Sequence, residues 1–187
     1  MDLLTHYKDF YHFEIQRSEV FDNRLQAPTA ALIVLIGFLA YVFEKINFSG
    51  EPVGVAMFGL PYLFSTIITC VSVYFLKSAW GGSKYEYLPL PRELEEYRKV
   101  LKKHYEEDDS GENVIATYKQ TMTEYYIKCA SFNSEVNEAR ARKLYLGVLA
   151  MSVASVLALI SCIPYYSYNL ELEKPTKIEL VSDKTSR

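Results

Sequence analysis

Two apolar runs separated by a short polar link make up residues 28–80, PTAALIVLIGFLAYVFEKINFSGEPVGVAMFGLPYLFSTIITCVSVYFLKSAW. The second run, Pro52 to Leu76, carries no charge over about 25 residues, which is long enough for a helix to cross a hydrocarbon layer of roughly 30 Å. Its apolar residues fall on every side of the helical period, unlike those of a soluble core helix. The stretch therefore predicts a transmembrane helical hairpin.

The first run is shorter, with about 17 uncharged residues from Ala27 to Phe43. Taken alone, that length also fits a buried soluble helix or the core of a signal peptide. The run lies far from Met1, follows an acidic and aromatic segment, and precedes no small-residue cleavage pattern. We therefore interpret it as the first arm of the hairpin, with Pro28 in its first helical turn.

A third apolar run, Leu144 to Ile163, predicts a third transmembrane helix, which we expect to end at Pro164. Ala150, Ala154 and Ala158 follow one another at four-residue intervals. Small residues at this spacing let two helices approach closely. We expect this ridge to pack helices and to support a homo-oligomer.

The apolar runs divide the chain into an N-terminal cytoplasmic helix (1–27), the hairpin (28–80), a cytoplasmic helical region (81–143), the third transmembrane helix (144–168) and a polar tail (169–187). The predicted fold class is all-α, a multi-pass membrane protein with three transmembrane helices. Lys and Arg residues flank the spans on the side of the N-terminus and the middle region. We therefore expect a protein of the cell inner membrane, with the N-terminus and middle region in the cytoplasm.

The middle region predicts two helices. The first opens at Pro91 and carries a stripe that includes Tyr97, Leu101 and Tyr105. The second begins near Glu112, and the sequence leaves open whether it ends before the third apolar run or continues into it as one helix of roughly 50 residues and roughly 75 Å. Its apolar residues approximate a heptad seam made of Val114, Tyr118, Thr121, Tyr125, Cys129, Phe132, Val136 and Ala139.

Asn133 and Asn137 lie one helical turn apart, just before the third span. Asparagines at that spacing can hydrogen-bond to another helix, either in a second copy of the chain or at its own N-terminus. Their charged neighbours favour a solvated stretch instead, and both interpretations stay open. Together with Tyr97, Leu101 and Tyr105, they are the candidate residues for cytoplasmic interactions.

Polar residues of the second span raise a related question. Ser65, Thr66, Thr69 and Ser72 are expected to bond backbone carbonyls or to bridge to another helix, rather than to line a pore. Pro61 is expected to kink the same helix.

The N-terminal helix also departs from a simple pattern, because Phe10 and Phe13 fall off its apolar stripe. We expect it to pack on two sides or to lie partly in the membrane interface.

Composition and motifs point away from an enzyme. The net charge is -3 and no segment clusters Lys and Arg, so we expect no nucleic-acid partner. The three cysteines form no disulfide framework, and phosphate-loop, zinc-hydrolase and serine-nucleophile motifs are absent from the sequence. No ionisable residue lies in the central part of a span, which disfavours an ion pathway. We therefore expect no catalytic residue, no metal and no cofactor.

The pattern Phe13-Glu14-x-x-Arg17, followed by Asn23-Arg24-Leu25, resembles small bacterial membrane proteins often encoded beside antiviral genes. The stretch from Tyr87-Leu88-Pro89 to Tyr97 and the pattern Asn133-x-x-x-Asn137-x-x-Arg140 fit the same group. The layout is similar to membrane effectors of cyclic-nucleotide, retron and related anti-phage systems. The resemblance implies a membrane-perturbing effector that acts by helix assembly. Its implied partners are the lipid bilayer, further copies of the chain, and a soluble defence partner or nucleotide signal.

An alternative function is a membrane adaptor or sensor that recruits a soluble partner through Tyr97, Leu101 and Tyr105. A third, an intramembrane enzyme, lacks catalytic groups in the sequence. For the effector, a rigid helix from Glu112 through the third span would carry a cytoplasmic shift to the membrane.

Overall fold

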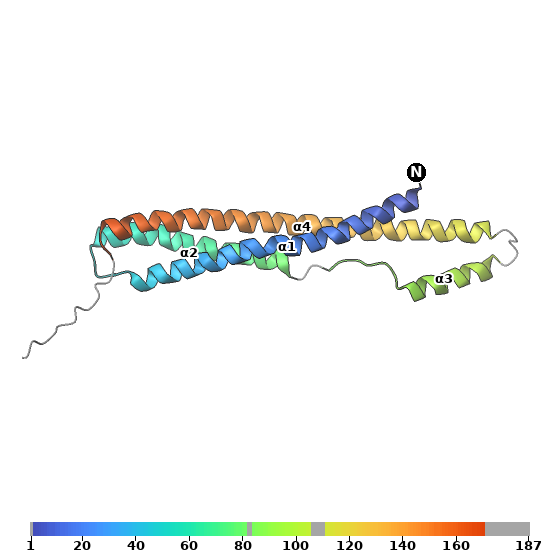
Figure 1. Ribbon diagram of the computed structural model, residues 1–187, viewed down its shortest axis with the longest axis horizontal. Helices are drawn as coiled ribbons and strands as arrows, with labels where there is room; N and C mark the ends of the chain where they lie inside the picture. The colour runs from blue at the N-terminus through green and yellow to red at the C-terminus, as the bar shows by residue number, and fades with distance from the viewer. Residues whose placement is uncertain (1, 82–83, 106–110, 171–187) are drawn as a thin grey trace, which may run out of the picture.

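The computed structural model describes residues 2–81, 84–105 and 111–170, which form four α-helices (Figure 1). They are α1 (Leu3–Lys45), α2 (Pro52–Trp80), α3 (Pro91–His104) and α4 (Glu112–Ser167). The described residues contain no strand, so the predicted all-α class is confirmed. Helix α4 packs on each of the other three helices, whereas α3 packs on α4 alone among the described helices.

Helix α4 runs along almost the whole molecule (Figure 1). Its 56 residues correspond to about 84 Å at a rise of about 1.5 Å per residue. Gly111, just before the helix, has a φ of 63°, which residues with a side chain rarely adopt. The helix is therefore continuous from the middle region through the third apolar run, a point that the sequence left open.

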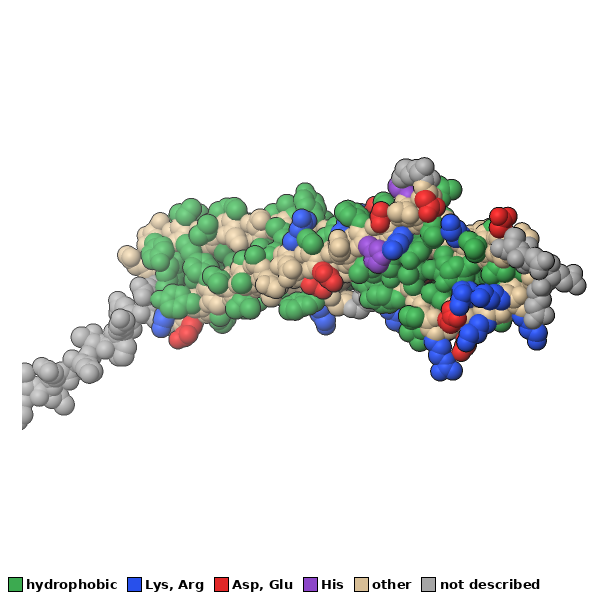
Figure 2. Space-filling view, turned by 45° about the vertical axis from the view of Figure 1, so that its right-hand side comes forward, with side chains coloured by type: hydrophobic (Ala, Val, Ile, Leu, Met, Phe, Trp, Pro, Cys, Tyr) green, Lys and Arg blue, Asp and Glu red, His purple; other side chains and the backbone are tan. Residues whose placement is uncertain are grey.

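Three of the helices, α1, α2 and α4, are long and apolar enough to cross a membrane. The chain is therefore compatible with an integral membrane protein. Figure 2 shows hydrophobic side chains over much of one half of the molecule and most of the charged side chains over the other. We call residues 27–81 and 144–167 the apolar half, and residues 3–26, 84–105 and 111–143 the polar half.

Prolines do not mark the helix ends that the sequence suggested. Pro28 lies inside α1 rather than in a first turn, and α4 continues past Pro164 to Ser167. A proline removes one backbone hydrogen bond, but packing on both sides of it can hold a helix together. Leu25 and Leu32, on either side of Pro28, are both buried in one cluster with α2. Helix α2 likewise runs on through Pro61.

The far end of the apolar half is closed by the link between α1 and α2. The backbone N–H of Asn47 in this link donates to the carbonyl of Leu170, at 2.7 Å. Gly54 at the start of α2 faces Tyr168, and an added Cβ there would lie 2.7 Å from the tyrosine ring. These contacts fix the end of α4 against both arms of the hairpin.

Candidate functional site

One face of α4 is buried or half-buried over most of its length, and its positions repeat every seven residues. One set comprises Tyr126, Asn133, Arg140, Gly147, Ala154 and Ser161, and the other comprises Ala130, Asn137, Leu144, Met151, Ala158 and Tyr165. We call these residues the α4 seam. Its two asparagines and its arginine lie in the polar half, whereas Gly147, Ala154, Ala158 and Ser161 lie in the apolar half.

The predicted heptad seam is wrong by one residue over much of its length. Val114 and Cys129 are buried as expected, but Tyr125 and Phe132 are 37% and 39% exposed. Their neighbours Tyr126 and Asn133 take the buried positions instead. The prediction assumed that apolar side chains face inward, whereas this helix buries polar side chains that find hydrogen-bond partners.

In the apolar half, two serines of α2 bond to the backbone of the α4 seam. Ser65 Oγ donates to the carbonyl of Ala154, and Ser72 Oγ donates to the carbonyl of Gly147, both at 2.8 Å. The two pairs are one heptad apart on each helix, so α2 and α4 stay in register. An added Cβ at Gly147 would lie 2.9 Å from the side chain of Leu76, which explains the small residue there.

The other two of the four residues considered in the sequence, Thr66 and Thr69, bond within α2 itself. Thr66 Oγ1 donates to the carbonyl of Tyr62 at 3.0 Å, and Thr69 Oγ1 donates to the carbonyl of Ser65 at 2.8 Å. The four hydroxyls thus divide between the two expected uses, local carbonyl bonds and bridges to another helix.

The alanine ridge faces the interior of the bundle. Ala154 and Ala158 are 0% and 1% exposed and cluster with Leu35 and Leu39 of α1, whereas Ala150 is half-buried. Close approach at this ridge therefore occurs within one chain. Packing between copies remains a prediction.

In the polar half, Asn137 joins α4 to α1. Its Nδ2 donates to both the backbone carbonyl and Oε2 of Glu14, each at 2.8 Å, and its Oδ1 accepts from the Tyr85 hydroxyl at 2.7 Å. Asn137 and Glu14 are 0% and 1% exposed, so the solvated interpretation of Asn137 is wrong. Within the chain, its partner is the N-terminal helix, one of the two partners that the sequence suggested.

Arg140 lies one turn further along and contacts three other segments. Its Nε donates to the carbonyl of Ala79 at 3.0 Å, and its terminal nitrogens donate to the Tyr85 hydroxyl at 2.8 Å and to the Asp22 carboxylate at 2.5 Å. Burial acts to lower the pKa of Arg140, but the Tyr85 and Asp22 bonds outweigh it and raise that pKa above its ordinary value. The guanidinium therefore keeps its charge within the fold.

Asn133 fastens the segment between α2 and α3 to α4. Its amide accepts from the N–H of Glu86 and donates to the carbonyl of the same residue, both at 2.9 Å. Lys128 also lies 3.4 Å from the Glu86 carboxylate. Among the described residues, no buried side-chain nitrogen or oxygen lacks a hydrogen-bond partner.

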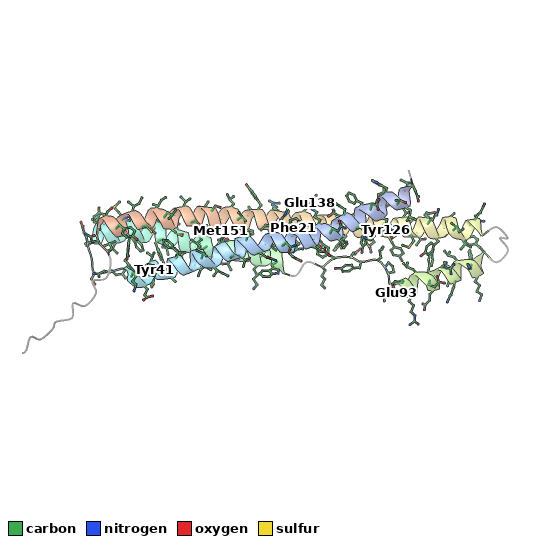
Figure 3. All side chains as sticks on the ribbon, viewed as in Figure 1. Phe21, Tyr41, Glu93, Tyr126, Glu138 and Met151 are labelled. Atoms are coloured by element: carbon green, nitrogen blue, oxygen red, sulfur yellow. The ribbon has the colours of Figure 1, made fainter. Side chains whose placement is uncertain are left out.

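We call Glu14, Asp22, Tyr85, Asn133, Asn137 and Arg140 the polar cluster. It joins α1, the end of α2, the segment after α2 and α4 at the boundary between the two halves. Figure 3 shows Phe21 on α1 close to the part of α4 that carries Glu138. The guanidinium of Arg140 lies 5.7 Å from the Phe21 ring centroid, which adds an aromatic contact to the cluster.

The stripe of α3 proposed for partner recruitment faces α4. Leu101 is 7% exposed, the Tyr97 hydroxyl lies 3.1 Å from Thr121 Oγ1, and the Tyr105 hydroxyl lies 3.4 Å from Thr117 Oγ1. A partner that used this stripe would have to displace α3 from α4. Recruitment through these residues remains a prediction.

Sequence reasoning identified the asparagines but missed their partners. No spacing rule connects Glu14 or Asp22 with residues more than a hundred positions away. The sequence did suggest the N-terminal helix as one possible partner of the asparagines, and Glu14 of that helix is bonded to Asn137.

Within residues 2–81, 84–105 and 111–170, no group of three His, Cys, Asp or Glu side chains could hold a metal ion. Comparisons of the chain with protein-family models, with curated proteins and with solved structures find no match. The function is therefore inferred from the polar cluster, the α4 seam and the membrane-compatible helices.

Proposed function

We propose that this chain is a multi-pass inner-membrane protein without enzymatic chemistry, in which the polar half controls the packing of the apolar half. In this proposal it is the membrane-perturbing effector of an anti-phage defence system and acts by helix assembly. The observation that carries the proposal is that one helix, α4, bears both the polar cluster and the small-residue seam.

A shift in the polar half would reach the spans through two routes that share α4. The helix itself is continuous from Glu112 to Ser167, so its halves cannot turn independently without breaking backbone bonds. Arg140 also holds the carbonyl of Ala79 at the end of α2, and Asn137 holds α1. Displacement of α4 would therefore move both arms of the hairpin.

Phage challenge of cells that carry the chain with its flanking genes tests this function. We expect a membrane-impermeant dye to enter wild-type cells after infection. Arg140→Gln should abolish dye entry while the protein still accumulates in the membrane, because the cluster is broken. Arg142→Gln is the matched control, since Arg142 is exposed on the same turn, and it should keep full dye entry. Equal dye entry in wild type and R140Q would contradict the proposal.

One feature favours the adaptor as a second candidate. A groove of about 700 Å³ lies between α1, α3 and α4 near the tip of the polar half, with Leu4, Lys102 and Tyr118 among its lining residues. Apolar walls with a cationic rim suit a soluble acidic or amphipathic partner. Stable co-purification of one soluble protein, without dye entry after infection, would favour this function over the effector.

A further inference from the structure

A groove between α1 and α4 lies where the two halves of the molecule meet. Its volume is about 430 Å³, and it is lined by Phe13, Arg17, Val20, Phe21 and Arg24 of α1 and by Ala141 of α4, among others. We call it the headgroup groove. It adjoins the polar cluster, because Arg17 pairs with Glu14 and the Phe21 ring lies beside Arg140.

Contacts of the polar cluster place this groove at the membrane surface. Arg140 binds the carbonyl of Ala79 on α2 and the carboxylate of Asp22 on α1, so these three positions share one level. Trp80, next to Ala79, is 63% exposed, and exposed tryptophan is typical of the membrane–water interface. Arg24 precedes the uncharged run that starts at Ala27 by only about 5 Å along the helix.

The charges in the groove favour an anion. Arg24 is exposed and makes no ion pair or hydrogen bond with any described residue. Arg17 lies two helical turns away on the same face, and its guanidinium is 3.4 Å from Glu14, whose Oε2 is also bonded to Asn137. Two arginines that line one groove can bind a phosphate through several charge-assisted hydrogen bonds.

A second, apolar groove lies between the same two helices inside the apolar half, and we call the two grooves together the α1–α4 crevice. The apolar groove has a volume of about 260 Å³ and is lined by residues of α1 and α4 that include Ala31, Val34, Leu35, Ser155 and Leu159. Each of these α1 residues lies two heptads after a residue of the headgroup groove, and Ser155 lies two heptads after Ala141. Ala31 and Leu35 lie about 6 and 12 Å along the helix past Ala27, where the uncharged run starts, so this groove falls within about half of a hydrocarbon layer of roughly 30 Å.

We propose that the α1–α4 crevice binds one anionic phospholipid of the leaflet next to the polar half. Arg17 and Arg24 hold the phosphate, and the apolar groove around Ala31 holds an acyl chain. The proposal rests on the membrane-spanning part of the proposed function and not on the defence role.

Native mass spectrometry of the full chain, purified from membranes in mild detergent, tests the site. Phosphatidylglycerol and phosphatidylcholine are added in turn, and the lipids retained per chain are counted. We expect one retained phosphatidylglycerol and little phosphatidylcholine. Arg24→Gln should reduce retention about fivefold, the size expected for one cation at an anionic membrane surface. Because Arg24 bonds no described residue, this variant should fold normally.

Two further variants separate the site from general attraction to anionic lipid. Ala31→Phe should fill the apolar groove and reduce retention without any change of charge, since Ala31 is exposed on α1. Lys77→Gln removes an exposed cation on α2, outside the crevice, and should retain the lipid as wild type does. The proposal would be overturned if K77Q and R24Q lost phosphatidylglycerol to the same extent, or if R24Q retained as much of it as the wild type. If the chain did not fractionate with membranes, the membrane placement itself would be wrong. The dye-entry experiment with phage tests the defence role separately.

Discussion

The two halves of the α4 seam share one heptad period but use opposite hydrogen-bond chemistry. In the polar half, α4 supplies side-chain donors, and Asn137 and Arg140 reach backbone carbonyls of α1 and α2. In the apolar half, α4 supplies backbone acceptors, and the side chain of Ser72 on α2 donates to Gly147. The polar half therefore selects which residues pair, and the apolar half sets how closely the helices approach.

This difference has an energetic basis. A buried amide or guanidinium that loses its partner incurs the full cost of desolvation, so the polar half tolerates few alternative pairings. Small residues such as Ala154 and Ala158 are less specific, because many helix registers would bring similar surfaces together. A single misplaced residue in the polar half would leave several groups unpaired at once.

The largest effect is expected for Arg140→Met, which breaks the polar half. The change leaves the Tyr85 hydroxyl and the Ala79 carbonyl without a bond from Arg140. We expect a loss of about 3 kcal/mol in the free energy of unfolding, the low end for a broken buried ion pair, because the Asp22 side chain is 60% exposed and can be hydrated. Denaturation in mild detergent, followed by circular dichroism, measures the loss.

Asp22→Asn is the matched variant for this prediction. It keeps Arg140 and its bonds to Tyr85 and Ala79, so the expected loss is at most about 1 kcal/mol. Equal losses in the two variants would mean that the ion pair, rather than the whole set of Arg140 bonds, carries the stability.

Asn137→Ala tests the same half at a neutral side chain. It removes the bonds to Glu14 and Tyr85, and we expect a loss of about 2 kcal/mol because the buried Glu14 carboxylate loses a donor. Asn23→Ala, at an exposed position of α1, should change the unfolding free energy by less than about 0.5 kcal/mol. The same denaturation experiment compares them, and an N137A variant as stable as N23A would refute a structural role for the asparagine.

Gly147→Ala tests the apolar half. The added Cβ would lie 2.9 Å from the side chain of Leu76 and 3.3 Å from its backbone nitrogen, so overpacking should cost about 1–2 kcal/mol. Gly59→Ala in α2 is the control, because nothing lies within 4 Å of its added Cβ. Unfolding in mild detergent should therefore occur earlier for G147A only.

Cys129 offers the smallest effect and a local probe. This thiol is 3% exposed, and burial raises its pKa above the ordinary value. At neutral pH a smaller fraction of it is thiolate than in a free cysteine, so its reaction with maleimide should be slow. The labelling rate should also level off at a higher pH than that of a free cysteine. In a chain without Cys70 and Cys162, Asn133→Ala should speed labelling. If Cys129 in the parent chain, which keeps Asn133, were labelled as fast as a free thiol, the Cys129 side chain would be accessible to solvent and this prediction would be wrong.

The apolar half was largely predictable from the sequence, and the polar half was not. Uncharged length alone indicated the spans, and the four-residue spacing of Ala154 and Ala158 indicated close packing. In the polar half, the alignment of α4 with its neighbours depends on Asn133, Asn137 and Arg140. A prediction from hydrophobic periodicity would place these polar residues on the surface. Their burial follows from partners such as Glu14, and only the fold reveals which distant residues meet.

Prolines illustrate the same limit. Local rules place Pro28 at a helix start, but α1 runs straight through it because Leu25 and Leu32 pack on α2. Tertiary packing thus overrides a local signal where the flanking residues are buried.

Cysteine cross-linking between α2 and α4 tests most directly whether the polar cluster sets the register of the apolar seam. In a chain without native cysteines, Ser65→Cys with Ala154→Cys should cross-link readily, because Ser65 Oγ lies 2.8 Å from the Ala154 carbonyl oxygen. The pair Ser65→Cys and Val153→Cys should not cross-link, because Val153 is 44% exposed and so points away from the packed interior. When Asn137→Ala and Arg140→Met are added, we predict that the first pair loses cross-linking and the second gains it. An unchanged pattern in that background would contradict the account, because the apolar half would then hold its register without the polar cluster.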